Sequence, residues 1–308
     1  MRIYSPSQTM DFFSCPAEWR LSRAGWQAKM FGRKELASIL GDAFHLAHAE
    51  YYRNGAPAVT PQILTDLSFL ARSKAEDSLA TLERQGFECW DNDRDLRNAL
   101  PLKAQTLVTR WLQENKVPRE WKTVAVEHML KDFGWCKLDL LVRPYPMERL
   151  AVLDAKVKLR LEKKEVAKEL EKYAYSWQFM HYAWAAAQHY EEPVTDYFVM
   201  LVVLEPGFHI QLEHYTVNPE LMLLWEQSAK SAWAVMAAMD GDPTDLQDMT
   251  DTLPGENPRP LYPWHNWEFF TRFGRREFAD AFLRHRCHSH LMVESYINTK
   301  EGGLSENK

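Results

Sequence analysis

The sequence predicts an α/β fold in which a central sheet is flanked by helices. Two strand-like segments, residues 135–142 and 150–157, precede a long helical pattern over residues 158–190. A continuous apolar run over residues 196–204 then has the composition of a central strand that is covered on both faces. Helical patterns at both ends of the chain supply the layers that would cover such a sheet.

Length and composition favour one folded domain. The 308 residues, 46% of them hydrophobic, can bury a sizeable core. We expect one domain over residues 1–300, made of a helical N-terminal part (1–120), a core (121–216) and a helical C-terminal part (217–300), with 301–308 as a disordered tail. No signal-peptide pattern and no long apolar run is found, so we expect a cytoplasmic protein without a membrane segment.

The remaining elements follow from the spacing of apolar residues. Helical patterns extend over residues 34–54, 61–85, 93–116 and 219–240, and further strands are expected at 122–130 and 208–216. The most basic stretch, residues 156–172, interleaves lysine with glutamate at helical ion-pair spacing. It therefore indicates either a solvated, self-paired helix face or a patch that contacts phosphates.

The first two strands are expected to form an antiparallel hairpin. Pro144 and Pro146 make a continuous strand across residues 143–148 unfavourable. Side chains two residues apart on a strand share a face, so Asp154 and Lys156 should point the same way.

The same alternation places Asp139 on one face of the other strand with Lys137 and Leu141, while Leu138 and Leu140 face the opposite layer. Two aspartates and a lysine on apolar strands are destabilising if they are buried without partners. A divalent cation between the carboxylates, with the lysine near a bound water, would remove this penalty. Ordinary polar positions on a solvated sheet face are the alternative.

Further polar residues occur on the neighbouring elements. Gly41 precedes His45 by four residues on a predicted helix, and Gln178 and Tyr182 share the face of another helix. Glu127 lies on the strand-like segment just before the hairpin.

In this order the motifs resemble the PD-(D/E)XK nuclease superfamily, specifically its RecB-like branch of DNA exonucleases, which includes phage exonucleases and CRISPR adaptation nucleases. That branch carries G-x-x-x-H, an aspartate strand, (D/E)-x-K and Q-x-x-x-Y. The matching residues here are Gly41…His45, Asp139, Asp154-Ala155-Lys156 and Gln178…Tyr182. Gly134 is spaced more loosely from Asp139 than the family's glycine, so only the aspartate is carried over. The resemblance implies a restriction-endonuclease-like core, a central mixed sheet flanked by helices.

The resemblance also implies a metal site. His45, Asp139, Asp154 and the carbonyl of Ala155 would hold one or two Mg²⁺ or Mn²⁺ ions, and Glu127 could complete the site. Oxygen-rich ligation suits hard cations of this kind.

The remaining motif residues would serve catalysis and DNA binding. The resemblance implies that Lys156 orients or deprotonates the attacking water and stabilises the transition state. Gln178 and Tyr182 would position the substrate strand or hold Lys156. Lys158 and Arg160, directly after the active-site strand, are candidates for phosphate contacts.

Two residues of the early helix have separate expectations. We expect His48, three residues after His45, at the surface or behind the metal ligands. We expect Gly41, which has no side chain, to let the helix pack close against the sheet.

The implied function is a Mg²⁺- or Mn²⁺-dependent deoxyribonuclease, an exonuclease in DNA replication, recombination or repair, including phage-encoded systems. Its partners would be DNA and a recombination or single-strand-binding protein, and its oligomeric state is left open. A catalytically silent protein that binds DNA or acts as an adaptor, and a metal enzyme for small molecules, are the alternatives. The formal charge of −6 argues against DNA binding over the whole surface, but not against a local positive groove.

Cysteine spacing predicts no thiolate metal cluster. The four cysteines, at positions 15, 89, 136 and 287, are scattered and indicate neither a disulfide framework nor a zinc module. Several RecB-like relatives hold an iron–sulfur cluster with one N-terminal and three C-terminal cysteines, whereas only Cys15 and Cys287 stand in such places here. We therefore expect no iron–sulfur cluster. A zinc site of Cys15 and Cys287, completed by His288 or His290, is the alternative.

Overall fold

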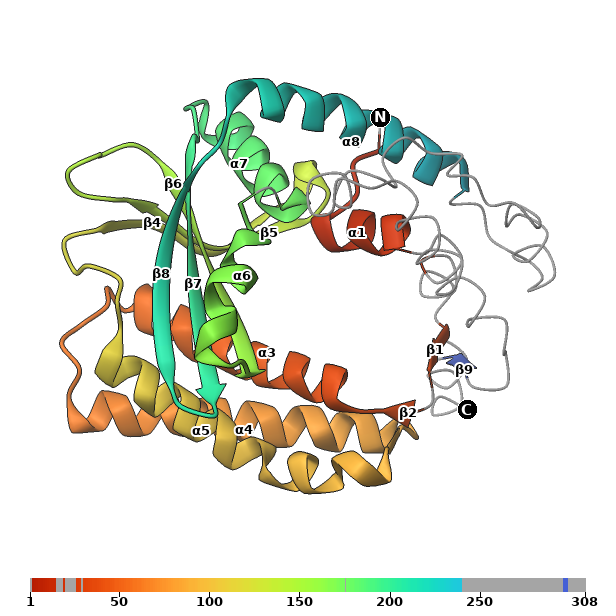
Figure 1. The fold of residues 1–308 in the computed structure, drawn as a ribbon, viewed down its shortest axis with the longest axis vertical. Helices are drawn as coiled ribbons and strands as arrows, with labels where there is room; N and C mark the ends of the chain where they lie inside the picture. Colours follow the sequence, from red (N-terminus) through yellow and green to blue (C-terminus); the bar gives the residue numbers. More distant parts are fainter. Residues whose placement is uncertain are drawn as a thin grey trace, which may run out of the picture.

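The computed structural model describes residues 2–14, 19, 26–28, 30–174, 176–239 and 296–298 of the chain. Its centre is a five-stranded sheet with the strand order β4-β5-β6-β7-β8 (Figure 1). The strands are β4 (Lys122–Leu130), β5 (Cys136–Arg143), β6 (Ala151–Arg160), β7 (Asp196–Glu205) and β8 (His209–Thr216). Because β6 and β7 pair in parallel and the other neighbours pair antiparallel, the sheet is mixed, as predicted.

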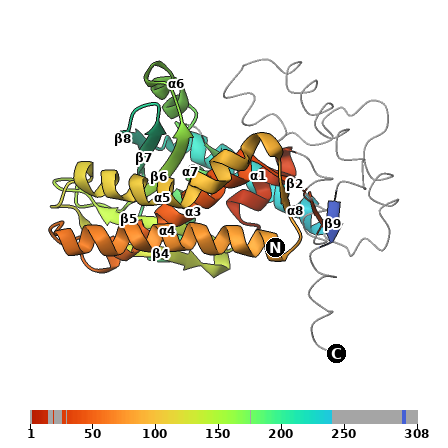
Figure 2. The same ribbon diagram turned by 90° about the horizontal axis from the view of Figure 1, so that it is seen from below.

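Helices cover both faces of this sheet. One layer contains α3 (Arg33–Arg53), α4 (Pro61–Arg84) and α5 (Arg94–Glu114), which run side by side (Figure 2). The other contains α1 (Pro6–Ser14), α6 (Val166–Glu171), α7 (Trp177–Tyr190) and α8 (Pro219–Met239). Short strands pair outside the sheet: β1 (Trp26–Ala28) with β9 (Tyr296–Asn298), and β2 (Met30–Phe31) with β3 (Glu88–Cys89). The predicted α/β fold is confirmed.

The strand β7 explains why the sheet needs two covering layers. Tyr197 and Val199 pack into the core under α7 and α8, whereas Phe198 and Met200 pack into the core under α3, α4 and α5. Its side chains therefore alternate between two apolar cores, as expected for a strand buried on both faces. This central strand is what holds β6, and with it the polar residues of β6, in a rigid position.

The prediction of one helix over residues 158–190 is wrong. β6 continues to Arg160, and a 3₁₀ turn (η3, Lys163–Glu165) and the short α6 then precede α7. The helix breaks between α6 and α7, where the hydroxyl of Tyr197 donates to the backbone oxygen of Tyr173 at 2.8 Å. The lysine–glutamate spacing resembles a helix, but pairing with β7 keeps the first residues extended.

The expected faces of β5 are also partly wrong. Leu138 packs with Leu141 in the core under α7, whereas Leu140 packs in the core under α3. β5 pairs with β6 only from Leu140 to Val142, and its earlier residues pair with β4 alone. On β4, Glu127 has a positive φ of 49°. Such irregular backbone re-aims side chains, so simple alternation does not hold at Asp139.

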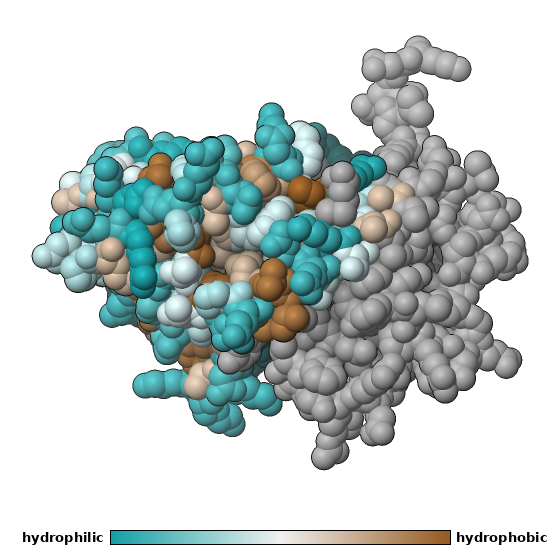
Figure 3. Space-filling model, turned by 90° about the horizontal axis from the view of Figure 1, so that it is seen from above, coloured by the Kyte–Doolittle hydropathy of each residue, from teal (hydrophilic) through white to brown (hydrophobic). Residues whose placement is uncertain are grey.

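Seen from the side of α8, the described part of the surface is mainly hydrophilic, with apolar residues in small separate groups (Figure 3). Among the helices that the structure describes, none combines the length and the apolar character needed to span a bilayer. Cys15, Cys287, His288, His290 and the expected tail lie outside the described residues.

His48 is fully buried, which corrects the expectation of a surface position. Its ring lies against those of Phe44, Tyr52 and Trp111, and neither ring nitrogen has a hydrogen-bond partner among the described residues. Burial lowers the pKa of His48 to about 3. His48 faces the core because it lies on the side of α3 that packs against α5. The spacing of residues along one helix does not specify which neighbouring helix that side will contact.

We predict that His48 makes the fold sensitive to acid. Between pH 6.5 and 3 the unfolded chain binds a proton at this residue and the folded chain does not, so stability falls as pH falls. From pH 7 to 5 the loss should be about 2 kcal/mol, at about 1.4 kcal/mol per pH unit below ~6.5. In urea denaturation, His48→Leu should remove this share of the pH dependence. Replacement of the exposed His189 by leucine should not, and equal pH dependence in all three proteins would contradict a buried neutral His48.

Candidate active site

The candidate site lies where β5 and β6 separate. Their pairing ends with Leu140 opposite Leu153, and the next residue on each strand beyond this pair is an aspartate, Asp139 or Asp154. Asp139 Oδ2 accepts a hydrogen bond from the backbone N–H of Ala155 at 3.1 Å. The two aspartates are only 7% and 2% exposed. The separation of the strands thus brings two buried carboxylates together.

Lys156 is held beside these carboxylates by α7. Its Nζ lies 2.7 Å from Asp154 Oδ2 and donates to Gln178 Oε1 at 2.9 Å. Gln178 Nε2 in turn donates to the hydroxyl of Tyr182 at 2.6 Å. Asp154 and Lys156 therefore share a face, and the two residues expected on the following helix form a chain of hydrogen bonds that ends at the lysine.

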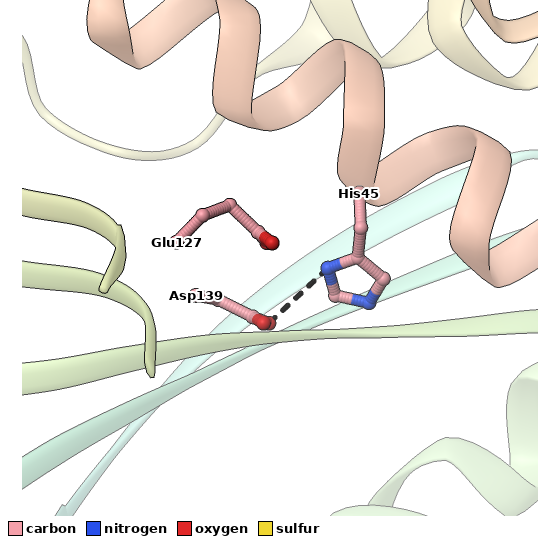
Figure 4. A group of neighbouring side chains, drawn as sticks. All are labelled: His45, Glu127 and Asp139. Atoms are coloured by element: carbon pink, nitrogen blue, oxygen red, sulfur yellow. Dashed lines mark ion pairs between the residues drawn. The ribbon is translucent and has the colours of Figure 1, made fainter. Parts of the chain in front are cut away.

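His45 and Glu127 reach the same place from other elements (Figure 4). His45 projects from α3 toward Asp139, and its Nδ1 lies 3.2 Å from Asp139 Oδ2. One potential ligand atom from each of His45, Glu127 and Asp139 lies within 4.8 Å of the others. Three elements that are distant in sequence thus meet at one group of nitrogen and oxygen atoms.

Lys137 belongs to this group, although the sequence offered no role for it. Its Nζ lies 2.5 Å from Glu127 Oε2, across the β4–β5 pair. The contact could have been inferred from the opposite charges of Glu127 and Lys137 on two neighbouring antiparallel strands. This ion pair fixes one oxygen of Glu127, while the other oxygen is buried without a hydrogen-bond partner among the described residues.

Charge and burial oppose each other here. Burial raises the pKa of Asp139 well above its usual range, the Asp154 carboxylate raises it further, and Lys156 lowers it. Burial also lowers the pKa of His45, which favours the neutral imidazole that metal ligation requires. The two aspartates therefore repel each other, and the positive charge of Lys156 compensates this repulsion only in part.

A divalent cation fits this group of residues. His45 Nδ1 and Glu127 Oε1 are buried and form no hydrogen bond within the described part of the chain. Buried polar atoms without partners are destabilising. Carboxylate oxygens with one imidazole nitrogen are ligands that Mg²⁺ or Mn²⁺ accepts. A cation here would give these atoms a partner and reduce the repulsion between Asp139 and Asp154.

The remaining predicted residues, Ala155, Lys158 and Arg160, lie on β6 with Asp154 and Lys156. Lys158 Nζ is 2.7 Å from Glu169 Oε1, so its charge is paired within the protein. Arg160 is exposed and has no ion pair among the residues that the structure describes. Ala155 lines a cleft whose walls are formed by residues of α3, α5 and β6.

The expectation for Gly41 is wrong. No atom outside its own helix backbone lies within 4 Å of the position that a Cβ would take. Gly41 therefore faces the open cleft beside the centre and does not pack against the sheet.

We predict that Asp139→Asn uncouples stability from metal binding. The amide oxygen can still accept from Ala155, and loss of the charge removes repulsion with Asp154, so the metal-free variant should melt no lower than the wild type. Mn²⁺ at 100 times its Kd should stabilise the wild type by about 2.7 kcal/mol and the variant much less. Thermal melts with and without Mn²⁺ measure both effects. Asp77→Asn, at an exposed position of α4, is the control; undiminished Mn²⁺ stabilisation of Asp139→Asn would contradict the assigned site.

Comparison with known proteins agrees with this geometry. The chain matches the family described as the PD-(D/E)XK nuclease superfamily over residues 3–251 of 308. No curated protein matches it. The five-stranded mixed sheet between helices corresponds to the restriction-endonuclease-like core, and nucleases of this superfamily use divalent metals. Since the match covers most of the chain and includes every residue of the centre, this protein belongs to the PD-(D/E)XK nuclease superfamily.

Proposed function

We propose that this protein is a metal-dependent deoxyribonuclease that acts as an exonuclease in DNA replication, recombination or repair. The observation that carries the proposal is the meeting of Asp139, Asp154 and Lys156 where β5 and β6 separate. Two carboxylates can bind a divalent cation that assists hydrolysis of a phosphodiester, and a lysine beside them can stabilise the negative charge of the phosphate. The match to a family of nucleases supports the same reaction class.

The residues of the centre have distinct proposed roles. Asp139, Asp154, Glu127 and His45 would hold one or two Mg²⁺ or Mn²⁺ ions, together with the Ala155 carbonyl. When bound, such a cation supplies activation of water and neutralisation of phosphate charge. The assignment is supported by two buried atoms, His45 Nδ1 and Glu127 Oε1, that form no hydrogen bond among the described residues.

Lys156 would act directly on the reacting atoms. Its Nζ can donate a hydrogen bond to the attacking water or to a phosphate oxygen, where negative charge increases in the transition state. Gln178 accepts from the same Nζ, and Tyr182 accepts from Gln178. These two residues position the lysine and hold it toward Asp154 when substrate is absent.

Exonuclease activity and DNA as the substrate are supported by the order of the motifs in the sequence, which resembles that of RecB-like exonucleases. A catalytically silent adaptor would need none of these three side chains. The presence of Asp139, Asp154 and Lys156 in one group, with both aspartates buried, therefore favours an enzyme.

We predict that Lys156→Met abolishes turnover and spares metal binding. Loss of the donor that stabilises the transition state should lower the cleavage rate of end-labelled DNA roughly 10²–10⁴-fold. Mn²⁺ should still stabilise the variant, because the four proposed side-chain ligands remain. Lys168→Met, at an exposed position of α6, should cleave like the wild type. Wild-type rates for Lys156→Met would show that the lysine has no part in the reaction.

A second prediction concerns DNA ends. An exonuclease should release nucleotides or short products from linear DNA and leave covalently closed circular DNA of the same sequence intact, because it begins at an end. Gel analysis of both substrates with Mg²⁺ or Mn²⁺ measures this. Equal cleavage of circles and linear molecules would identify an endonuclease instead.

A further inference from the structure

Glu127 reaches the centre through an irregular stretch of β4. In the pairing of β4 with β5 it falls opposite Asp139, because the residues on either side of the two are partners. Its φ of 49° is a left-handed conformation that residues other than glycine rarely adopt. Two carboxylates opposite each other on neighbouring strands also repel. A positive group close to Glu127 is therefore needed to hold it in this position.

Lys137 supplies that positive charge. Its Nζ lies 2.5 Å from Glu127 Oε2, and the side chain of Glu127 is only 14% exposed. The other oxygen, Oε1, is buried and forms no hydrogen bond within the described part of the chain. Glu127 also contributes to the group of potential ligand atoms with His45 and Asp139 (Figure 4). One oxygen of Glu127 thus contacts an ammonium group, which leaves the other for a cation.

The two aspartates of the centre are engaged in a similar way. Asp139 Oδ2 accepts from the backbone N–H of Ala155 at 3.1 Å, and Asp154 Oδ2 lies 2.7 Å from Lys156 Nζ. The two ions of a two-metal site lie about 3.5–4 Å apart, a separation that a carboxylate spans by binding one ion with each oxygen. Each carboxylate of this centre already has one oxygen in contact with a donor of the protein. The arrangement therefore favours a single cation.

The charges of the centre favour the same number. When the carboxylates of Glu127, Asp139 and Asp154 are ionised, Lys137 and Lys156 leave one negative charge uncompensated, because a ligating imidazole is neutral. One divalent cation reverses the sign of this charge. A second would add two more positive charges to a site with little water, where like charges repel strongly. The two ammonium groups thus take the place of a second ion.

We propose that the centre binds one divalent cation, and that Lys137 excludes a second by occupying Glu127 Oε2. The proposal rests on the proposed function, which requires a cation, and it adds the number of ions and the residue that sets this number. Lys137 acts through Glu127, so it is a positioning residue and needs no contact with the substrate.

Counting bound ions tests the proposal without DNA. The full-length protein would be titrated with Mn²⁺, and the electron paramagnetic resonance signal of the free ion would give the number bound and the Kd. At free Mn²⁺ about ten times the Kd, the wild type should bind close to one ion per chain. Two ions of similar affinity, or none, would overturn the proposal. This count needs no variant.

Lys137→Met should allow a second ion to bind. The substitution frees Glu127 Oε2 and removes one positive charge, so the variant should bind two Mn²⁺ per chain. Two Mn²⁺ ions about 3.5–4 Å apart couple magnetically and change the spectrum of the bound metal. This signature distinguishes a pair in the centre from an ion on the acidic surface. A folded Lys137→Met that binds one ion, or two without coupling, would contradict the role of Lys137.

Three further variants control for charge and for the place of the second ion. Lys137→Arg keeps the ion pair and should bind one Mn²⁺. Lys122→Met removes the same charge from an exposed position of β4 and should also bind one. The double variant Lys137→Met, Glu127→Gln should return to one, because the second ion needs the Glu127 carboxylate. A second ion in any of these three proteins would refute the mechanism.

The outcomes separate this proposal from the proposed function. If the wild type binds one ion and Lys137→Met binds a coupled pair, but no divalent metal supports hydrolysis of DNA, the nuclease function fails and this inference stands. If the wild type hydrolyses DNA with two ions bound in the centre, the function stands and this inference fails.

Discussion

The site depends on one hydrogen bond, from the backbone N–H of Ala155 to Asp139 Oδ2. Regular pairing of β5 with β6 ends one residue earlier, so the Asp139 side chain takes the place of a backbone acceptor. This contact ties the separating strands together and keeps a carboxylate buried beside Asp154.

The two helical layers supply different parts of the centre. α3 approaches from one side of the sheet and provides His45, while α7 approaches from the other and holds Lys156 through Gln178. β6 is central in the sheet and is paired along most of its length with the doubly buried β7. Asp154 and Lys156 thus stand on a central strand that is hydrogen-bonded along most of its length, which limits how far either side chain can move.

The electrostatics of the centre follow from burial. Asp139 and Asp154 repel each other in a site with little water, and one lysine lies next to them. Such an arrangement is unfavourable in an empty protein and becomes favourable when a divalent cation enters. At the proposed metal site, the stability that this repulsion costs the metal-free protein would be regained when a cation binds.

The sequence by itself determined the α/β class, the order of the five central strands and the residues of the motifs, because apolar periodicity and short-range spacing are local properties. It also predicted that Asp154 and Lys156 share a face, since β6 is regular there. Only the tertiary structure decided which side Leu138 takes, that His48 is buried, and that Gly41 faces a cleft. The alternation of side chains between the two faces of a strand fails where strand pairing becomes irregular, as in β5. The burial of a side chain is set by residues that are distant in sequence. The faces of β5 and the environments of His48 and Gly41 therefore do not follow from local spacing.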